Sequence, residues 1–183
     1  MRIEQTPLQD CFIVHEKVHG DARGYFIETF NQRDFNTASG LDISFVQDNQ
    51  SRSSRGVLRG LHMQSGASAQ AKLVRVLEGS VLDIAVDLRK GSPSFGQHYA
   101  IELTADNHKQ FFVPAGFAHG FVVLSEAATF FYKVDKFYEP GNEVGIMYND
   151  TELNIDWKLA DSEIILSEKD KTLGSFAAYA ASL

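Results

Sequence analysis

The chain has 183 residues, of which 44% are hydrophobic and 22% charged, and its formal net charge is −7. This length suits one domain spanning residues 1–183, and an acidic balance without a run of Lys or Arg argues against nucleic acid and anionic membranes as partners. The single cysteine, Cys11, excludes an intramolecular disulfide, and the N-terminal residues lack an apolar signal segment, so we expect a cytoplasmic location.

Short apolar runs separated by turn residues follow one another along the chain. The first half predicts strands at 11–18 and 25–30, and a short helix at 33–40 that ends at Gly40. Residues 72–88 predict two strands joined by a turn at 78–80. Strands at this spacing, with Gly-rich turns, are typical of a β-sandwich or barrel, so helix is the minority structure. The other expected elements are strands at 59–64, 97–103, 109–116, 119–125 and 128–135, and a helix within 172–183.

Side chains alternate between the two faces of a strand, and this alternation turns several polar groups inward. Tyr132, for example, shares the more apolar face of its strand with Phe130 and Val134. A buried lysine and a cluster of titratable groups are both costly unless they are paired, so such a cluster predicts a functional site. The inward set comprises His62, Gln64, Lys72, His119 and Tyr132.

Taken singly, the polar residues have structural interpretations. A histidine in a strand is more often structural than catalytic. Asp83 and Asp87 form either a paired-carboxylate site or two strand residues bonded to neighbours, and we favour the second interpretation. Arg23 and Glu28 could form a surface ion pair of little energetic weight. Asp170, near the C-terminus, would be a solvated charge on position alone.

Two spacings are informative together. Gly56 precedes His62 by six positions, and Gln64 follows; Pro114, Gly116 and His119 form a second group. These are the spacings of the two cupin motifs, which predict a mainly β double-stranded β-helix, or jelly-roll barrel. Metal-binding cupins have a second histidine where Gln64 stands, and His62 and His119 alone fall short of the three or more protein ligands of a stable metal site. The ligand count therefore favours a site without metal.

Longer motifs in the same order resemble one family. Residues 47–64, QDNQSRSSRGVLRGLHMQ, are similar to the signature of the dTDP-4-dehydrorhamnose 3,5-epimerases, which are metal-free cupins of nucleotide-sugar metabolism. The resemblance covers nearly the whole chain and implies inversion of carbons 3 and 5 of a dTDP-4-keto-6-deoxy sugar, in dTDP-L-rhamnose biosynthesis, without a cofactor. It continues through GDARGYFIETF, AQAKLVRVLEGSVLDIAVDLRKGSPSFG, FFVPAGFAHGF, YKVDKFYEPGNEVGIMYND and LSEKD.

The resemblance also implies roles for individual residues. His62 is the expected base, oriented by Asp170; Tyr132 is the acid on the opposite face of the sugar; and Lys72 stabilises the enolate. Tyr138 matches the residue that stacks on thymine. The remaining expected substrate-binding residues are Arg23, Glu28, Gln47, Asp48, Asn49, Arg59, His119, Glu143 and Lys169, together with Lys72 itself.

The family is dimeric and exchanges N-terminal strands, so the resemblance predicts a homodimer in which Arg23 and Glu28 serve the neighbour's site. Departures from the family pattern, such as Met63 in place of an aromatic and Lys158 after Trp157, fall on no catalytic position. Three alternatives remain open: a relative that acts at one carbon or isomerises the ketone, a binding protein without catalysis, and a metal-dependent cupin.

Overall fold

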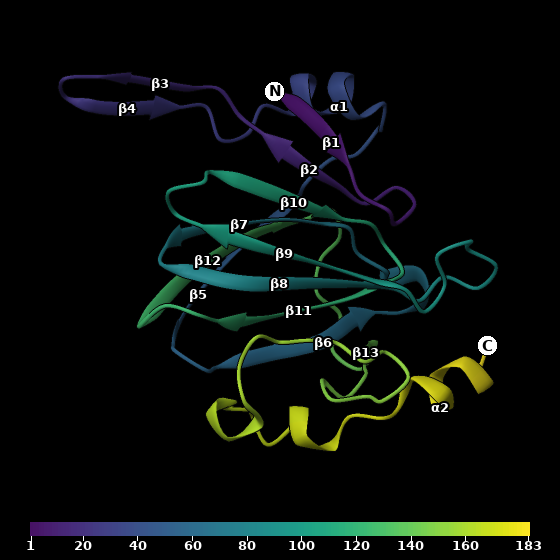
Figure 1. Ribbon diagram of the computed structural model, residues 1–183. Coiled ribbons are helices and arrows are strands. Elements are labelled where there is room, and N and C mark those ends of the chain that lie inside the picture. Colours follow the sequence, from purple (N-terminus) through teal and green to yellow (C-terminus); the bar gives the residue numbers. More distant parts are fainter.

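Two antiparallel sheets face each other in the computed structural model, which describes residues 1–183 (Figure 1). The six-stranded sheet has the order β1 (Arg2–Gln5), β2 (Phe12–His15), β10 (Lys109–Val113), β7 (Lys72–Glu78), β12 (Ala127–Val134) and β5 (Gln47–Ser54). The five-stranded sheet has the order β13 (Glu143–Gly145), β6 (Leu58–Gln64), β11 (Phe117–Val123), β8 (Ser80–Asp87) and β9 (His98–Thr104). This arrangement confirms the mainly β jelly-roll prediction.

Helices are short and lie outside the sheets. The helix α1 (Gln32–Ser39) begins after Asn31, whose side chain accepts a hydrogen bond from the backbone N–H of Asp34, and ends at Gly40 in the left-handed conformation. The expected C-terminal helix is α2 (Phe176–Ala181). Both helix predictions are confirmed. Three 3₁₀ turns complete the helical structure, η1 (Gly66–Ser68), η2 (Asp161–Glu163) and η3 (Asp170–Thr172).

Three hydrophobic clusters hold the layers together. The largest lies between the sheets and joins Phe111 and Phe130 of one sheet to Phe117 and Phe121 of the other. A second cluster fixes the C-terminal segment against the outer face of the five-stranded sheet, where Trp157 is buried. The third packs α1 through Phe35 onto the outer face of the six-stranded sheet. The inner cluster fills only part of the barrel, and its remaining interior holds the site.

Several strand predictions need correction in detail. Residues 72–88 form two strands as expected, but β7 and β8 belong to different sheets, so the turn at Gly79 is a connection between sheets and not a hairpin. The expected strand at 11–18 is shorter than predicted and ends at His15. Val18 belongs to the next strand, β3 (Val18–Asp21). No strand was predicted at β5, whose sequence QDNQSRSS lacks apolar residues.

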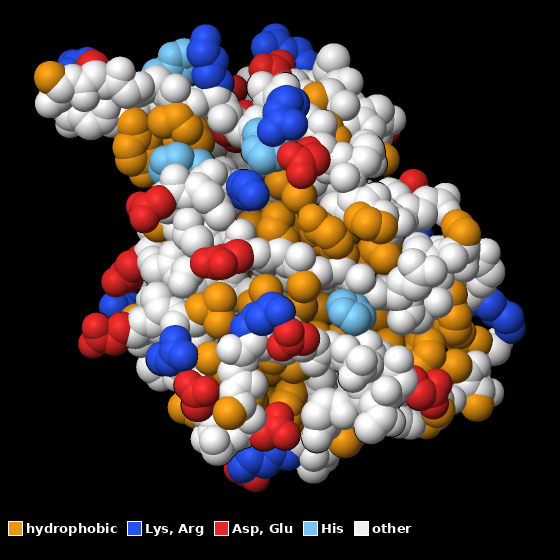
Figure 2. All heavy atoms as spheres, viewed as in Figure 1, with side chains coloured by type: hydrophobic (Ala, Val, Ile, Leu, Met, Phe, Trp, Pro, Cys, Tyr) orange, Lys and Arg blue, Asp and Glu red, His pale blue; other side chains and the backbone are white.

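A hairpin made of β3 and β4 (Gly24–Ile27) stands away from the barrel (Figure 1). Acidic and basic side chains are interspersed over the face seen in Figure 2, where no basic patch is visible. None of the helices is long and apolar enough to cross a bilayer.

Candidate active site

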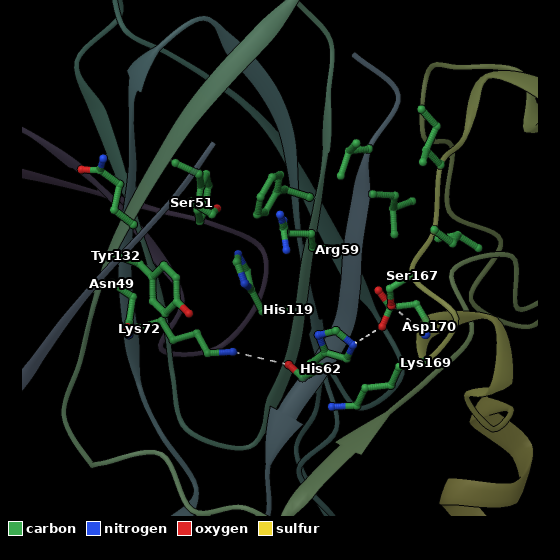
Figure 3. Close-up of a pocket in the computed structure, with 17 residues that line it drawn as sticks. Asn49, Ser51, Arg59, His62, Lys72, His119, Tyr132, Ser167, Lys169 and Asp170 are labelled. Atoms are coloured by element: carbon green, nitrogen blue, oxygen red, sulfur yellow. Dashed lines mark hydrogen bonds and ion pairs between the residues drawn. The ribbon is translucent and has the colours of Figure 1, made fainter. Parts of the chain in front are cut away.

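A cavity of about 560 Å³ opens between the two sheets (Figure 3). Its walls come from β5, β6, β7, β11 and β12, and the C-terminal segment 165–170 forms one side. Four of the five polar residues predicted to point inward line this cavity: His62, Lys72, His119 and Tyr132. The fifth, Gln64, lines a neighbouring cavity of about 340 Å³, which shares Asn49, His62, Lys72 and Tyr132 with the first.

The register between β6 and β11 brings the two cupin histidines together. His62 and His119 are directly opposite in this antiparallel pair. Beside them the backbones approach closely, since a Cβ placed on Gly60 would lie 2.6 Å from the Cα of Gly120 and 2.7 Å from the carbonyl oxygen of His119. Gly60 also has a φ of +122°, so glycine is required there for two reasons. Gly60 thus allows the close approach of β6 and β11 that places the two histidines opposite each other.

His62 is held from the C-terminal segment. Its Nε2 lies 2.5 Å from Oδ1 of Asp170, whose side chain is 5% exposed, whereas the imidazole is 26% exposed. The expectation of a solvated Asp170, made from position alone, is therefore wrong, and the contact implied by the family resemblance is present. Because Nε2–H donates to the carboxylate, the second ring nitrogen is left as the basic one. In Figure 3 one edge of the ring faces Asp170 and the other faces the cavity.

Lys72 and Tyr132 line the cavity from the six-stranded sheet, across from His62. Burial lowers the pKa of Lys72 to about 8, although the carboxylates of Asp83 and Glu143 act in the opposite direction. Its ammonium has one hydrogen bond, to the carbonyl oxygen of His62 at 3.4 Å, so most of its donor capacity is free. Burial raises the pKa of Tyr132, which keeps its phenol protonated.

A second histidine–carboxylate pair lies deeper. His119 Nε2 is 2.9 and 3.0 Å from the two oxygens of Asp83, and the side chains are 8% and 0% exposed. Asp87 makes different contacts, with Arg89, Ser92 and Ser94. The two aspartates therefore form no carboxylate pair, in agreement with the interpretation that each is bonded to neighbours.

Arg59 supplies a second cation near the mouth of the site. Its Nε and Nη2 donate to Oγ of the buried Ser53 at 3.2 and 3.1 Å. These bonds hold the guanidinium on the cavity wall (Figure 3). A cation fixed at the wall in this way suits a diphosphate, which accepts several charge-assisted hydrogen bonds.

The smaller cavity is lined by amides and an aromatic ring. Gln47 donates to Asn49 at 2.9 Å, and Tyr138 donates to Glu143 at 3.4 Å. Glu143 also accepts from Lys169 at 2.5 Å, and these bonds lower its pKa against the effect of burial. A half-exposed tyrosine ring next to amides is suited to stack on a planar base.

Three of the expected binding residues lie elsewhere in this chain. Asp48 is on the outer face of β5 and binds Lys133 at 2.9 Å. Arg23 and Glu28 line neither cavity. The suggested ion pair between them is wrong, because Arg23 binds Asp21 at 2.5 Å and 3.1 Å.

Two functional contacts were not predicted from the sequence. Asp83 was interpreted as a strand residue, and its role as the partner of His119 required the pairing of β8 with β11. Ser53 lies in the polar strand β5, and its role as the hydrogen-bond acceptor for Arg59 was not predicted. The face shared by Asn49, Ser51 and Ser53 is a signal that could have identified it, since alternation places all three on one side.

Comparisons with known proteins agree over almost the entire chain. Residues 5–178 match the family described as dTDP-4-dehydrorhamnose 3,5-epimerase. A dTDP-4-dehydrorhamnose 3,5-epimerase of Pseudomonas aeruginosa is 53% identical over 177 residues, which are 97% of each chain. The crystal structure of such an epimerase from Elizabethkingia anophelis superposes with a TM-score of 0.94 at 54% identity, covering 97% of each chain.

A further solved structure carries a ligand. It is a dTDP-6-deoxy-D-glucose-3,5-epimerase from Legionella pneumophila in complex with dTDP-4-keto-L-rhamnose, 46% identical, with a TM-score of 0.91. The alignment covers 95% of this chain and 92% of that one.

Proposed function

Because the chain belongs to the dTDP-4-dehydrorhamnose 3,5-epimerase family, we propose that it inverts carbons 3 and 5 of dTDP-4-keto-6-deoxyglucose with His62 as base and Tyr132 as acid. Membership makes it an enzyme of the isomerase class. The product is dTDP-4-keto-L-rhamnose, the ligand of the Legionella relative. We also propose a cytoplasmic location, which the lone cysteine supports.

One observation carries the proposal: a base and an acid line opposite walls of one cavity, with an ammonium between them (Figure 3). His62 belongs to the five-stranded sheet, and Tyr132 and Lys72 belong to the six-stranded sheet. Epimerisation takes a proton from one face of a carbon and returns one to the other face. Two groups on opposite walls satisfy this requirement, which a single group does not.

Carbons 3 and 5 both flank the ketone, so their hydrogens are weakly acidic. His62 removes a proton through the ring nitrogen that does not bind Asp170, and the imidazolium that forms is stabilised by that carboxylate. Tyr132 then delivers a proton from the opposite wall. The raised pKa of its phenol means that it holds this proton at neutral pH.

Negative charge develops on the ketone oxygen as the proton leaves. Lys72 stabilises it from a partly buried position, where an ammonium acts more strongly than in water. Arg59 and Lys169 bind the diphosphate, and Tyr138 stacks on the base next to Gln47 and Asn49. His119 contributes to binding the sugar.

We further propose a homodimer that completes the site. Tyr25 and Phe26, on the projecting hairpin of β3 and β4, are 62% and 68% exposed, and Figure 2 shows hydrophobic side chains on the side of this hairpin that faces the barrel. Two large, solvent-exposed apolar side chains side by side are typical of a protein–protein interface. A second copy would bring Arg23 and Glu28 of this hairpin to its neighbour. Replacing Tyr25 and Phe26 with serine should give a monomer in light scattering and a raised KM; an unchanged dimer would contradict the proposal.

Proton exchange followed by NMR tests the chemistry directly. The protein is incubated with dTDP-4-keto-6-deoxyglucose in deuterium oxide, without added metal. Deuterium at both carbons 3 and 5, lost in His62→Ala, supports the double epimerase. Deuterium at one carbon only indicates a single-site epimerase, and no exchange with intact binding indicates a binding protein or another substrate.

The variant Tyr132→Phe separates the two proton transfers. We expect it to keep exchange at the face of His62 while inversion is lost, because the base can return a proton to the side from which it took one. A variant that inverts at the wild-type rate would rule out Tyr132 as the acid.

A further inference from the structure

The pair of His119 and Asp83 has no defined part in the chemistry above. Asp83 is fully buried in the middle of β8, and its side chain makes hydrogen bonds to His119 and to no other group. Burial of an ionised carboxylate is expensive and raises the pKa of Asp83, whereas His119 and Lys72 act in the opposite direction and favour its charged form. A fold that needed only packing at this position would be better served by an apolar residue. The position therefore suggests a functional reason for the charge.

The charges around Lys72 indicate what that reason is. The carboxylates nearest to the cavity are Asp83, Glu143 and Asp170. Asp170 is committed to His62 at 2.5 Å, and Glu143 is committed to Lys169 at 2.5 Å. Asp83 is bonded to His119, and it acts more strongly on the charge of Lys72 than Glu143 does.

The other elements bring cations and neutral donors to the cavity that Lys72 lines. Arg59 and His62 come from β6, His119 from β11 and Tyr132 from β12, while Lys169 comes from the C-terminal segment. Burial disfavours a charge on Lys72, and the carboxylates of Asp83 and Glu143 act in the opposite direction. Of these two carboxylates, Glu143 is already paired with Lys169, so Asp83 is the counter-charge that has no lysine partner.

We propose that Asp83 is a positioning residue of this site: its hydrogen bond fixes the orientation and tautomer of His119, and its charge keeps the Lys72 ammonium ionised next to the sugar. The carboxylate acts on Lys72 through space, because no ion pair joins them. It acts on His119 through Nε2–H, which leaves the other ring nitrogen for the substrate. The inference rests on the proposed function, since it needs an oxyanion for Lys72 to stabilise.

The direction of the charge effect follows from the neighbours of Lys72. Asp83 is the larger of the two carboxylate influences that raise the pKa of Lys72, which lies at about 8. Replacing Asp83 with asparagine removes that influence, so the pKa of Lys72 must fall. If the pKa of Lys72 falls by one unit, the charged fraction of Lys72 at pH 8 falls from about one-half to about one-tenth.

The test is a titration of Lys72 in wild type and in Asp83→Asn, with ¹⁵N-labelled lysine and the resonance assigned by Lys72→Gln. We expect the pKa of Lys72 to fall by about one unit or more in Asp83→Asn. The alkaline limb of kcat/KM on dTDP-4-keto-6-deoxyglucose should move to lower pH by the same amount, while the affinity for dTDP changes by less than about twofold. An unchanged titration of Lys72 would overturn the inference.

Asp87→Asn is the matched control. Asp87 is equally buried and lies on the same strand, but its partners are Arg89, Ser92 and Ser94, away from both cavities. Its replacement should lower the unfolding temperature and leave the titration of Lys72 in place. An equal shift in both variants would show that loss of a buried charge is enough, and would overturn a specific role for Asp83.

The titration does not depend on turnover, so the inference can fail separately from the proposed function. A wild-type protein without exchange activity refutes the proposed function, whereas active wild type with an unshifted Lys72 in Asp83→Asn refutes the role of Asp83. If Asp83→Asn does not fold, the wild-type protein still gives a result. The ¹⁵N spectrum of His119, assigned with His119→Asn, must show a proton on Nε2; a neutral ring protonated only on Nδ1 would overturn the inference.

Discussion

Two histidine–carboxylate pairs share one cavity, and they are built differently. His119 and Asp83 come from neighbouring strands of one sheet and are almost completely buried. His62 stands on the next strand, but its partner Asp170 comes from 108 residues further along the chain, and the imidazole is partly exposed. In both pairs Nε2 faces the carboxylate.

The difference indicates how one arrangement serves two tasks. A base has to reach the substrate and change its charge in every cycle, so it needs access and a partner that can stabilise the imidazolium. A positioning pair needs a fixed geometry, which a rigid sheet supplies better than a loop. We therefore assign the pair of His62 and Asp170 to proton transfer and the pair of His119 and Asp83 to the electrostatics of the cavity.

The largest expected effect comes from the pair of His62 and Asp170. His62→Ala removes the base, so kcat in the epimerase assay should fall by about 10⁴-fold. The affinity for dTDP, measured by calorimetry, should be nearly unchanged, because the diphosphate and base are bound by other residues. His98→Ala is the control, since His98 lies on β9 and lines neither cavity. Near wild-type turnover in His62→Ala would contradict the assignment of His62 as the base.

Asp170→Asn tests whether the partner of the base matters as much as the base. The asparagine keeps the shape but cannot stabilise the imidazolium, so kcat should fall by about 10²-fold while KM changes little. Glu168→Gln, two residues away and paired with Lys171 on the surface, is the matched control. Equal kinetics of Asp170→Asn and Glu168→Gln would mean that Asp170 only closes the wall of the cavity.

The pH dependence of kcat/KM concerns the ammonium between the two pairs. The pKa of Lys72 is lowered to about 8, so its charge is present below this pH and is lost as the pH rises through it. Activity should therefore be about one-half of its plateau at pH 8 and should fall about fivefold more by pH 9, to roughly one-tenth of the plateau. A profile that stays level up to pH 10 would contradict a role for the charged form of Lys72.

The smallest effect is expected outside both pairs. Ser53→Ala removes the acceptor for Arg59, whose guanidinium then moves more freely at the cavity wall. We expect KM to rise about fivefold, which corresponds to about 1 kcal/mol, with kcat unchanged. Ser54→Ala, on the exposed face of the same strand, is the control. A fall in kcat with an unchanged KM would place Ser53 in the chemistry and not in binding.

Local pattern was sufficient for much of the fold and for the inward set. Period-two alternation identified most strands and turned Lys72, His119 and Tyr132 toward the interior, where the cavity lies. The glycine at position 40 ended α1 as expected. Family resemblance, rather than alternation, named Asp170 as the partner of His62. Alternation in β5 was overlooked because all its residues are polar, and hydrophobic periodicity carries no signal there.

What the sequence by itself determined is therefore most of the strands, the faces of their side chains and the membership of a family whose motifs are colinear with this chain. Tertiary structure alone decided that β7 and β8 lie in different sheets and that Asp83 lies against His119. It also decided that Asp170 is buried where it contacts His62, a pairing that only the family resemblance had indicated. The physical reason is range. Alternation and capping depend on neighbours within a few residues, whereas these contacts join segments 36 and 108 residues apart, and only the packing of the whole barrel sets their distances.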